Sequence, residues 1–174
     1  MRPTETPTPA DPEAWFAYLA EGNAKQARKR VAADVLLRDP AGRVLLVNPT
    51  YKPGWDLPGG MAEANESPED AVRRELLEEL GQQITVRGLL VVDWVAPHGP
   101  WDDQLAFIFD GGTVAGDQID RLTPQDGELA EAAFLTTDVA HARLGDRMRL
   151  RFTAALDAVT DRYPRYLRNG TRLF

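Results

Sequence analysis

The chain has 174 residues, a formal net charge of −7 at neutral pH and no cysteine. This length suits one domain with a sizeable core. The lack of cysteine excludes disulfides, thiol catalysis and cysteine-ligated metal sites. The negative charge argues against general nucleic-acid binding, because that binding depends on Lys and Arg side chains that neutralise phosphates.

Targeting and membrane signals are also missing from the sequence. No apolar run approaches the roughly 18 residues that a membrane span needs. The first twelve residues are rich in Pro and Thr and contain no signal-peptide core. We therefore expect a soluble, cytoplasmic protein with no membrane partner.

The N-terminal residues 1–29 are expected to form an arm outside the main domain. Residues 1–12 are predicted to be flexible, and residues 13–22 have the pattern of a short amphipathic helix that ends at Gly22. A basic cluster follows, which we interpret as a solvated linker, with phosphate or partner binding as the alternative. Its members are Lys25, Arg28, Lys29 and Arg30.

The rest of the chain alternates between strand and helix patterns. Two apolar runs, at 31–38 and 43–48, flank a hairpin signal. One or two further strands are expected within 84–95 and another at 104–110. Residues 146–161 have helical spacing. Strands around a central helix, followed by a C-terminal helix, predict an α/β layered domain.

The central helix is predicted over residues 68–80. Ser67 is a good N-cap residue, Pro68 suits the first helical position, and Gly81 supplies a stop with positive φ. Asp70 completes an acidic variant of the capping box. The expected apolar stripe consists of Val72, Leu76, Leu77 and Leu80.

Three glutamates on this helix are spaced to share one face. Glu75, Glu78 and Glu79 stand at positions i, i+3 and i+4, where like charges repel by roughly 0.2–0.5 kcal/mol per pair. Such a face is either solvated or offset by a bound cation. The paired glycines Gly59 and Gly60 precede the helix and let the backbone approach a ligand closely. Carboxylates and a bare carbonyl are oxygen donors of the kind that Mg²⁺ prefers.

The segment from Gly60 to Gly81 resembles the signature of the Nudix hydrolases, Gly-x5-Glu-x7-Arg-Glu-U-x-Glu-Glu-x-Gly-U, where U is a bulky aliphatic residue. The one departure is Gln82 at the final aliphatic position, which concerns local packing, and Ile84 is a candidate to compensate. The matching positions are Gly60, Glu66, Arg74, Glu75, Leu76, Glu78, Glu79 and Gly81.

The resemblance implies a Nudix-type α/β/α sandwich with a mixed β-sheet over residues 30–162, followed by a C-terminal tail at 163–174. It implies a pyrophosphohydrolase that cleaves a diphosphate linkage with Mg²⁺, or alternatively Mn²⁺, as cofactor. Glu66 and Arg74 are expected to form an ion pair that joins the loop to the helix. The expected catalytic and metal-binding glutamates are Glu75, Glu78 and Glu79, and the Gly59 carbonyl is a further expected ligand.

A second segment, 126–135, resembles the stretch in which many Nudix enzymes carry an acid before an aromatic–aliphatic pair. That acid helps to bind metal or acts as the general base. Glu128 fits this place best, and Glu131 is the second choice. A surface acid without function is the alternative. Whether Glu128 or one of the helix glutamates is the base stays open.

The substrate is less defined by the sequence. Pro97 stands fifteen residues beyond Gln82, a position that resembles the proline of ADP-ribose-hydrolysing members. Trp55 and Arg74 are further candidate substrate contacts. We expect a small-molecule nucleoside diphosphate derivative, such as ADP-ribose or a nucleotide sugar. The alternatives are a nucleoside triphosphatase that includes oxidised nucleotides and a non-catalytic ligand sensor, and a homodimer is left open.

Overall fold

A computed structural model describes residue 6 and residues 8–114, 116–125 and 127–173. The arm expected over residues 1–12 therefore lies partly outside the described residues. Within the described part of the chain, no helix is long and apolar enough to cross a membrane.

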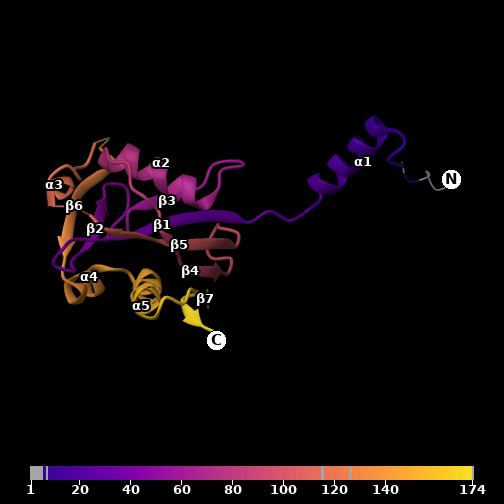
Figure 1. Cartoon of the computed structure of the whole chain (residues 1–174). Coiled ribbons are helices and arrows are strands. Elements are labelled where there is room, and N and C mark those ends of the chain that lie inside the picture. The colour runs from indigo at the N-terminus through magenta and orange to yellow at the C-terminus, as the bar shows by residue number, and fades with distance from the viewer. Residues whose placement is uncertain (1–5, 7, 115, 126, 174) are drawn as a thin grey trace.

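One mixed sheet of eight strands forms the centre of the protein (Figure 1). Its strand order is β6-β2-β1-β5-β4-β7-β8, and β3 pairs with β1 beside this path. The β1–β5 and β4–β7 pairs are parallel and the other pairs are antiparallel, which confirms the predicted mixed sheet. The strands are β1 (Arg30–Arg38), β2 (Val44–Pro49), β3 (Gly59–Met61), β4 (Gly88–Val95), β5 (Gln104–Thr113), β6 (Leu129–Leu135), β7 (Arg165–Arg168) and β8 (Thr171–Arg172).

Helices cover both faces of this sheet, as the α/β/α prediction requires (Figure 1). The α2 helix packs on one face, where Val72, Leu76 and Leu80 join a buried cluster with strand residues. The α5 helix packs on the other face, where Phe152 and Ala155 are buried. The helices are α1 (Pro12–Ala24), α2 (Pro68–Leu80), α3 (Gly116–Ile119), α4 (Thr137–Arg143) and α5 (Asp146–Asp161).

The central strand β1 has two different partners along the same edge. At its end, Arg38 pairs with Val44 of β2, so the predicted hairpin is present at its turn. Near its start, residues 32–34 pair instead with β3. The two strands of the hairpin separate away from the turn, and β3, which contains the glycine turn at 59–60, pairs with β1 where β2 no longer does. This arrangement holds the turn against the middle of the sheet.

Residues of β1 alternate between the two layers. Ala33, Val35 and Leu37 lie in the cluster on the α2 side, whereas Leu36 lies in the cluster on the α5 side. A strand buried on both faces reads as a continuous apolar run. Asp34 interrupts this run on the α5-facing side, and its side chain is buried.

The N-terminal helix and the C-terminal segment differ in their relation to the sheet. The α1 helix extends away from the layers (Figure 1), and none of its thirteen residues is buried. Residues 163–174, expected to be a tail, contribute β7, which pairs in parallel with β4. Arg165 and Leu167 point inward and are buried, so this strand is part of the sheet, with β8 beyond it at the edge. Four residues are too few to give a recognisable strand pattern in the sequence.

The exit of α2 also packs as the sequence indicated. Ile84 and Val86 are partly buried against the cluster under α2, although β4 begins only at Gly88. The side-chain amide of Gln82 donates a hydrogen bond of 2.8 Å to the Gly81 carbonyl. Ile84 therefore supplies the apolar contact that Gln82 does not.

Candidate active site

The α2 helix begins and ends at the predicted residues, which fixes the direction of its glutamates. The Ser67 hydroxyl accepts a hydrogen bond of 3.2 Å from the Asp70 amide and donates one of 2.8 Å to the Asp70 carboxylate. Gly81 ends the helix with φ of +67°. The predicted stripe was wrong at one position, because Leu77 is 48% exposed. The helix is rotated so that Glu79, only 5% exposed, faces the sheet side instead.

A cavity of about 330 Å³ collects the acids that the sequence analysis singled out. Glu75 and Glu79 enter it from α2, and Glu128 enters from the residue before β6. Gly59 and Gly60 of β3 line it as well. Three separate parts of the chain therefore meet at one place: α2, β3 and the residue before β6.

The two glycines are required by close contacts. Gly59 has φ of +141°, and a Cβ there would lie 2.2 Å from the Ala33 carbonyl oxygen. A Cβ on Gly60 would lie 2.4 Å from a Glu75 carboxylate oxygen. Any side chain at Gly60 would push the Glu75 carboxylate away, so the glycine gives this acid its place beside the backbone.

Arg74 holds the acidic segment together. Its Nε and Nη2 atoms each donate to a different carboxylate oxygen of Glu66 at 2.9 Å, which confirms the predicted ion pair. Its Nη1 donates to Glu75 at 3.0 Å and to Glu78 at 3.1 Å, and Nη2 also reaches the Met61 carbonyl. All three nitrogens of Arg74 are bound to the protein, and Arg74 does not line the described cavity. Its geometry is that of a positioning residue.

The carboxylates around Arg74 have different environments. The Arg74 guanidinium lowers the pKa of Glu66 by donating hydrogen bonds to it. Burial raises the pKa of Glu75 despite its contact with Arg74, and the charges of Glu78 and Glu128 raise it further. Glu78 has a side chain that is 55% exposed and does not line the described cavity.

Glu128 occupies the position that its sequence context indicated. The Thr50 amide donates a 2.7 Å hydrogen bond to its carbonyl, which ties this residue to the end of β2. Its charge acts on Glu75, so the two carboxylates are close enough to interact. Glu131 lies further along β6, opposite Asn48, and is absent from the described lining. The structure thus brings Glu128, rather than Glu131, to the cavity.

Two residues suggested as substrate contacts lie elsewhere. The Trp55 ring is covered by the Arg143 guanidinium at 4.6 Å and packs against the core on the α5 side. Pro97 is exposed in the connection between β4 and β5. Neither residue lines the described cavity. The Trp55 ring packs against the core on the α5 side, and Pro97 lies in an exposed loop.

Several cavity residues were missed by the sequence analysis. Asp34, Lys52, Asp56 and Arg151 all line it. Lys52 pairs with Asp56 at 2.7 Å. Burial raises the pKa of Asp34 well above its ordinary value, and the Asp56 carboxylate adds to this effect. One signal was available, because Asp34 is a lone acid inside the apolar run 31–37.

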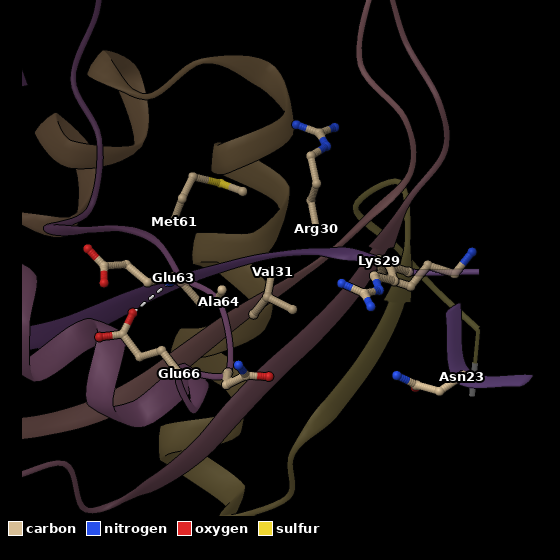
Figure 2. A pocket seen from close by; sticks show the side chains of 11 residues that line it. Asn23, Lys29, Arg30, Val31, Met61, Glu63, Ala64 and Glu66 are labelled. Atoms are coloured by element: carbon tan, nitrogen blue, oxygen red, sulfur yellow. Dashed lines mark hydrogen bonds between the residues drawn. The ribbon is translucent and has the colours of Figure 1, made fainter. Parts of the chain in front are cut away.

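A larger hollow of about 620 Å³ lies next to this cavity (Figure 2). It is bounded by the linker residue Lys29, by Arg30 at the start of β1 and by the loop that follows β3. In that loop the Glu66 carboxylate accepts a 2.8 Å hydrogen bond from the Glu63 amide. Its described lining contains neither Glu75 nor Glu79, so the chemistry belongs to the smaller cavity. Met61 lines both spaces, and they adjoin there.

The donors available for a metal ion are few. Among the described residues, no three His, Asp or Glu side chains converge closely enough to hold an ion by themselves. The cavity instead offers the carboxylates of Glu75 and Glu79 and the backbone of Gly59. Mg²⁺ is usually bound by one or two carboxylates and keeps several waters or substrate phosphates. This all-oxygen, incomplete set fits that ion.

The fold and the cavity together define a class: an α/β/α scaffold in which a glycine turn meets an acidic helix. The NUDIX domain family model matches residues 28–156, which is more than half of the chain. The chain therefore belongs to the Nudix family of hydrolases.

Two curated relatives illustrate the range of this similarity. A MutT-like protein of Streptomyces ambofaciens is 30% identical over 125 residues, covering 72% of this chain and 75% of that protein. The NAD-capped RNA hydrolase NudC of Mycobacterium tuberculosis is 34% identical over 112 residues, covering 63% of this chain and 33% of NudC. The match spans about a third of NudC.

Solved structures confirm the fold. The MutT protein of Methanosarcina mazei has a TM-score of 0.64 at 22% identity, covering 77% of this chain and 99% of its own. A UDP-X diphosphatase has a TM-score of 0.63 at 17% identity, covering 90% and 87%. An ADP-ribose pyrophosphatase of Streptococcus suis has a TM-score of 0.56 at 17% identity, covering 81% and 99%. At these identities the likeness concerns the fold alone.

Proposed function

We propose that this Nudix hydrolase is a Mg²⁺-dependent enzyme that cleaves the diphosphate of a nucleoside diphosphate linked to another moiety, such as ADP-ribose or a nucleotide sugar. Mn²⁺ is the alternative ion. The observation that carries this proposal is the single cavity that Glu75, Glu79 and Glu128 share with the Gly59–Gly60 turn. Oxygen donors beside a backbone turn suit a hard cation and a phosphate group.

Each residue of this cavity receives a separate task. Glu75 and Glu79, with the Gly59 carbonyl, would hold the ion. A bound Mg²⁺ neutralises charge that develops on the diphosphate and lowers the pKa of water. Arg74 keeps the Glu75 carboxylate in place through its 3.0 Å hydrogen bond. Hydrolysis of the P–O–P bond then yields two monophosphates.

We assign the general base to Glu128, with Glu75 as the alternative. Glu128 lies across the cavity from α2 and is not part of the helix that would hold the ion. Its side chain is exposed, so water reaches its carboxylate. A base must come within hydrogen-bond reach of the attacking water, directly or through one further water. The placement of Glu128 is compatible with that requirement.

The space around the cavity supports a substrate with a group on each side of its diphosphate. The catalytic cavity adjoins the larger hollow of Figure 2 at Met61. A substrate with a nucleoside on one side of its diphosphate and a second moiety on the other needs space beyond the catalytic cavity, and the adjoining hollow provides it. Two proteins of similar fold are a UDP-X diphosphatase and an ADP-ribose pyrophosphatase. A putative 8-oxo-dGTP diphosphatase of Bacillus subtilis is 45% identical over 49 residues, covering 28% of this chain and 33% of that protein, and supports nucleoside triphosphates as the second candidate class.

A panel of substrates separates these classes. Wild-type protein is incubated with Mg²⁺ and ADP-ribose, UDP-glucose, ATP, dGTP or 8-oxo-dGTP, and products are identified by mass spectrometry. We expect ADP-ribose or UDP-glucose to give two monophosphates with a kcat/KM at least about tenfold above any triphosphate, the size of preference that pocket contacts provide. Preferred release of pyrophosphate from a triphosphate would establish the second class. No hydrolysis of any probe contradicts both.

The charge of the protein bears on its partners. The charge of −7 supports small nucleotides, rather than nucleic acids in general, as partners. We propose a cytoplasmic location, where nucleotides and Mg²⁺ are available, and residues 1–29 as an arm of the catalytic domain. A homodimer is the assembly that light scattering would test.

A further inference from the structure

Two buried aspartates in this protein have opposite surroundings. Asp93 on β4 is 0% exposed, accepts a 2.7 Å hydrogen bond from Arg151 Nε, and accepts a bifurcated hydrogen bond from the Gly170 amide at 3.0 and 3.1 Å from its two oxygens. Asp34 on β1 is 8% exposed. Among the residues that the structure describes, no N–H or O–H group donates to its carboxyl.

The cations nearest to Asp34 are already engaged. Lys52 is paired with Asp56 at 2.7 Å, and Arg151 is paired with Asp93. The carboxylates of Asp56 and Glu79 act on Asp34 with unfavourable charge. A buried carboxyl without hydrogen bonds is destabilising, and native proteins satisfy nearly all such groups. Asp34 is 8% exposed and lines the cavity, so a donor to its carboxyl has to come from the cavity side.

The carboxyl of Asp34 faces the catalytic cavity. It lines that space together with Gln104 and the α5 residue Met148. In the ladder between β1 and β3, Asp34 is directly opposite Gly59 of the glycine turn. The unsatisfied acceptor thus lies beside the place where the diphosphate would bind.

A diphosphate itself cannot satisfy Asp34, because its oxygens are acceptors and carry negative charge. The donors of the proposed substrate belong to its organic part, namely the hydroxyl groups of a sugar and the N–H groups of a base. A carboxyl keeps an acceptor oxygen in either protonation state. Donor-bearing groups are therefore the chemistry that Asp34 accommodates.

We propose that Asp34 accepts a hydrogen bond from a hydroxyl or N–H donor on the organic moiety next to the diphosphate, and that it is a specificity-determining residue. This inference rests on the proposed function. A site built to hydrogen-bond a donor rejects analogues that lack it, because its buried acceptor is then left unpaired.

The test compares Asp34→Asn and Asp34→Ala with wild type in two measurements. The first is KM and kcat for ADP-ribose and UDP-glucose. We expect KM for the preferred substrate to rise at least about tenfold in Asp34→Ala while kcat changes less, since a ground-state contact is lost. The second is the melting temperature without ligand, which we expect to rise by about 2–5 °C in Asp34→Asn because a buried, unpaired carboxyl is removed.

Asp93→Asn is the matched control, because it alters a buried aspartate whose hydrogen bonds are made. Its melting temperature should fall. A purely structural role for Asp34 would give the same fall and an unchanged KM, and this result would overturn the inference.

Direct binding distinguishes the sources of the donor and does not depend on turnover. Calorimetry compares ADP with 2′-deoxy-ADP, which lacks one hydroxyl, and GDP with IDP, which lacks the 2-amino group. Loss of discrimination within the first pair in Asp34→Ala identifies a sugar hydroxyl, and loss within the second identifies a base donor. Unchanged affinities for all four, together with an unchanged KM for ADP-ribose and UDP-glucose, overturn the inference even if wild type is active. Inactivity of the wild type toward every substrate, with Asp34-dependent binding intact, contradicts the proposed function alone.

Discussion

The glutamates of the Nudix motif divide between two sides of α2. Glu75 and Glu79 face the cavity, whereas Glu66 and Glu78 lie on the side of Arg74. The side chains are chemically identical, but one pair shares a buried space with the glycine turn and the other pair neutralises a guanidinium. Residues of one motif therefore serve different purposes, and burial and partners reveal which.

The helix geometry explains this division. Glu75 and Glu79 are four residues apart and lie above one another on the helix. Arg74 and Glu78 are also four residues apart and form the neighbouring row, with a hydrogen bond of 3.1 Å. Glu75 alone joins both rows, because it lines the cavity and accepts from Arg74. The repulsion between adjacent acids is thus offset on one side by Arg74.

Removal of divalent ions tests whether Glu75 and Glu79, which face the cavity, hold a metal ion that turnover requires. With excess EDTA, we expect turnover of the preferred substrate to fall at least about 1,000-fold and to return when Mg²⁺ is added, because charge neutralisation and water activation are lost together. Phosphate release or nucleotide product is the readout. Full activity in EDTA would show that the Glu75–Glu79 pair has no ion to hold.

A Glu128 variant tests whether a catalytic residue of the cavity lies outside α2. Glu128→Gln should reduce kcat about 100- to 10,000-fold, the range typical of a lost general base, with KM little altered. Glu131→Gln is the matched control, an exposed acid three residues further along on β6, and should leave kcat within about twofold, since surface changes have small effects. Equal effects in the two variants contradict the assignment of Glu128.

Glu78 tests the other side of the helix. Glu78→Gln removes a half-exposed carboxylate whose observed contact is with Arg74, so we expect kcat to fall by about tenfold or less. Steady-state kinetics at saturating Mg²⁺ provides the measurement. A loss as large as that from Glu79→Gln would erase the distinction between the two sides.

Glu66 gives the smallest expected effect, on stability and its pH dependence. The Arg74 guanidinium holds the pKa of Glu66 below its ordinary 4.5. Ionised Glu66 therefore stabilises the fold above that pH, and this contribution is lost as pH falls through the lowered pKa. We expect Glu66→Gln to melt below wild type at pH 7 and to converge with it at an acid pH below the lowered pKa of Glu66. A constant difference at both pH values would count against the ion pair.

The sequence predicted the parts of the fold that depend on local patterns. The α2 and α5 helices have the expected limits, because Ser67 and Gly81 cap one and an apolar spacing marks the other. Strand β7 was missed, since its identity depends on pairing with β4 and not on four residues of its own. The register of β3 on β1 is likewise a tertiary property.

The site was predicted where a motif exists and missed where it does not. The motif located Glu75, Glu79 and the glycine turn, and its resemblance indicated Glu128. Asp34 and Arg151 are far apart in sequence and line one cavity only because α5 packs on the sheet that contains β1, so no sequence spacing predicts them. Trp55 was chosen for its chemistry, but the core on the α5 side takes up its ring.

The most direct test of the central claim compares Glu79→Gln with Glu78→Gln in the same assay. These neighbours differ in burial and in access to the cavity but have the same side chain. We predict that Glu79→Gln lowers Mg²⁺-dependent turnover by about 10³-fold or more, with circular dichroism and melting close to wild type, while Glu78→Gln loses about tenfold or less. Near-normal turnover in Glu79→Gln would contradict the assignment of this cavity as the catalytic metal site.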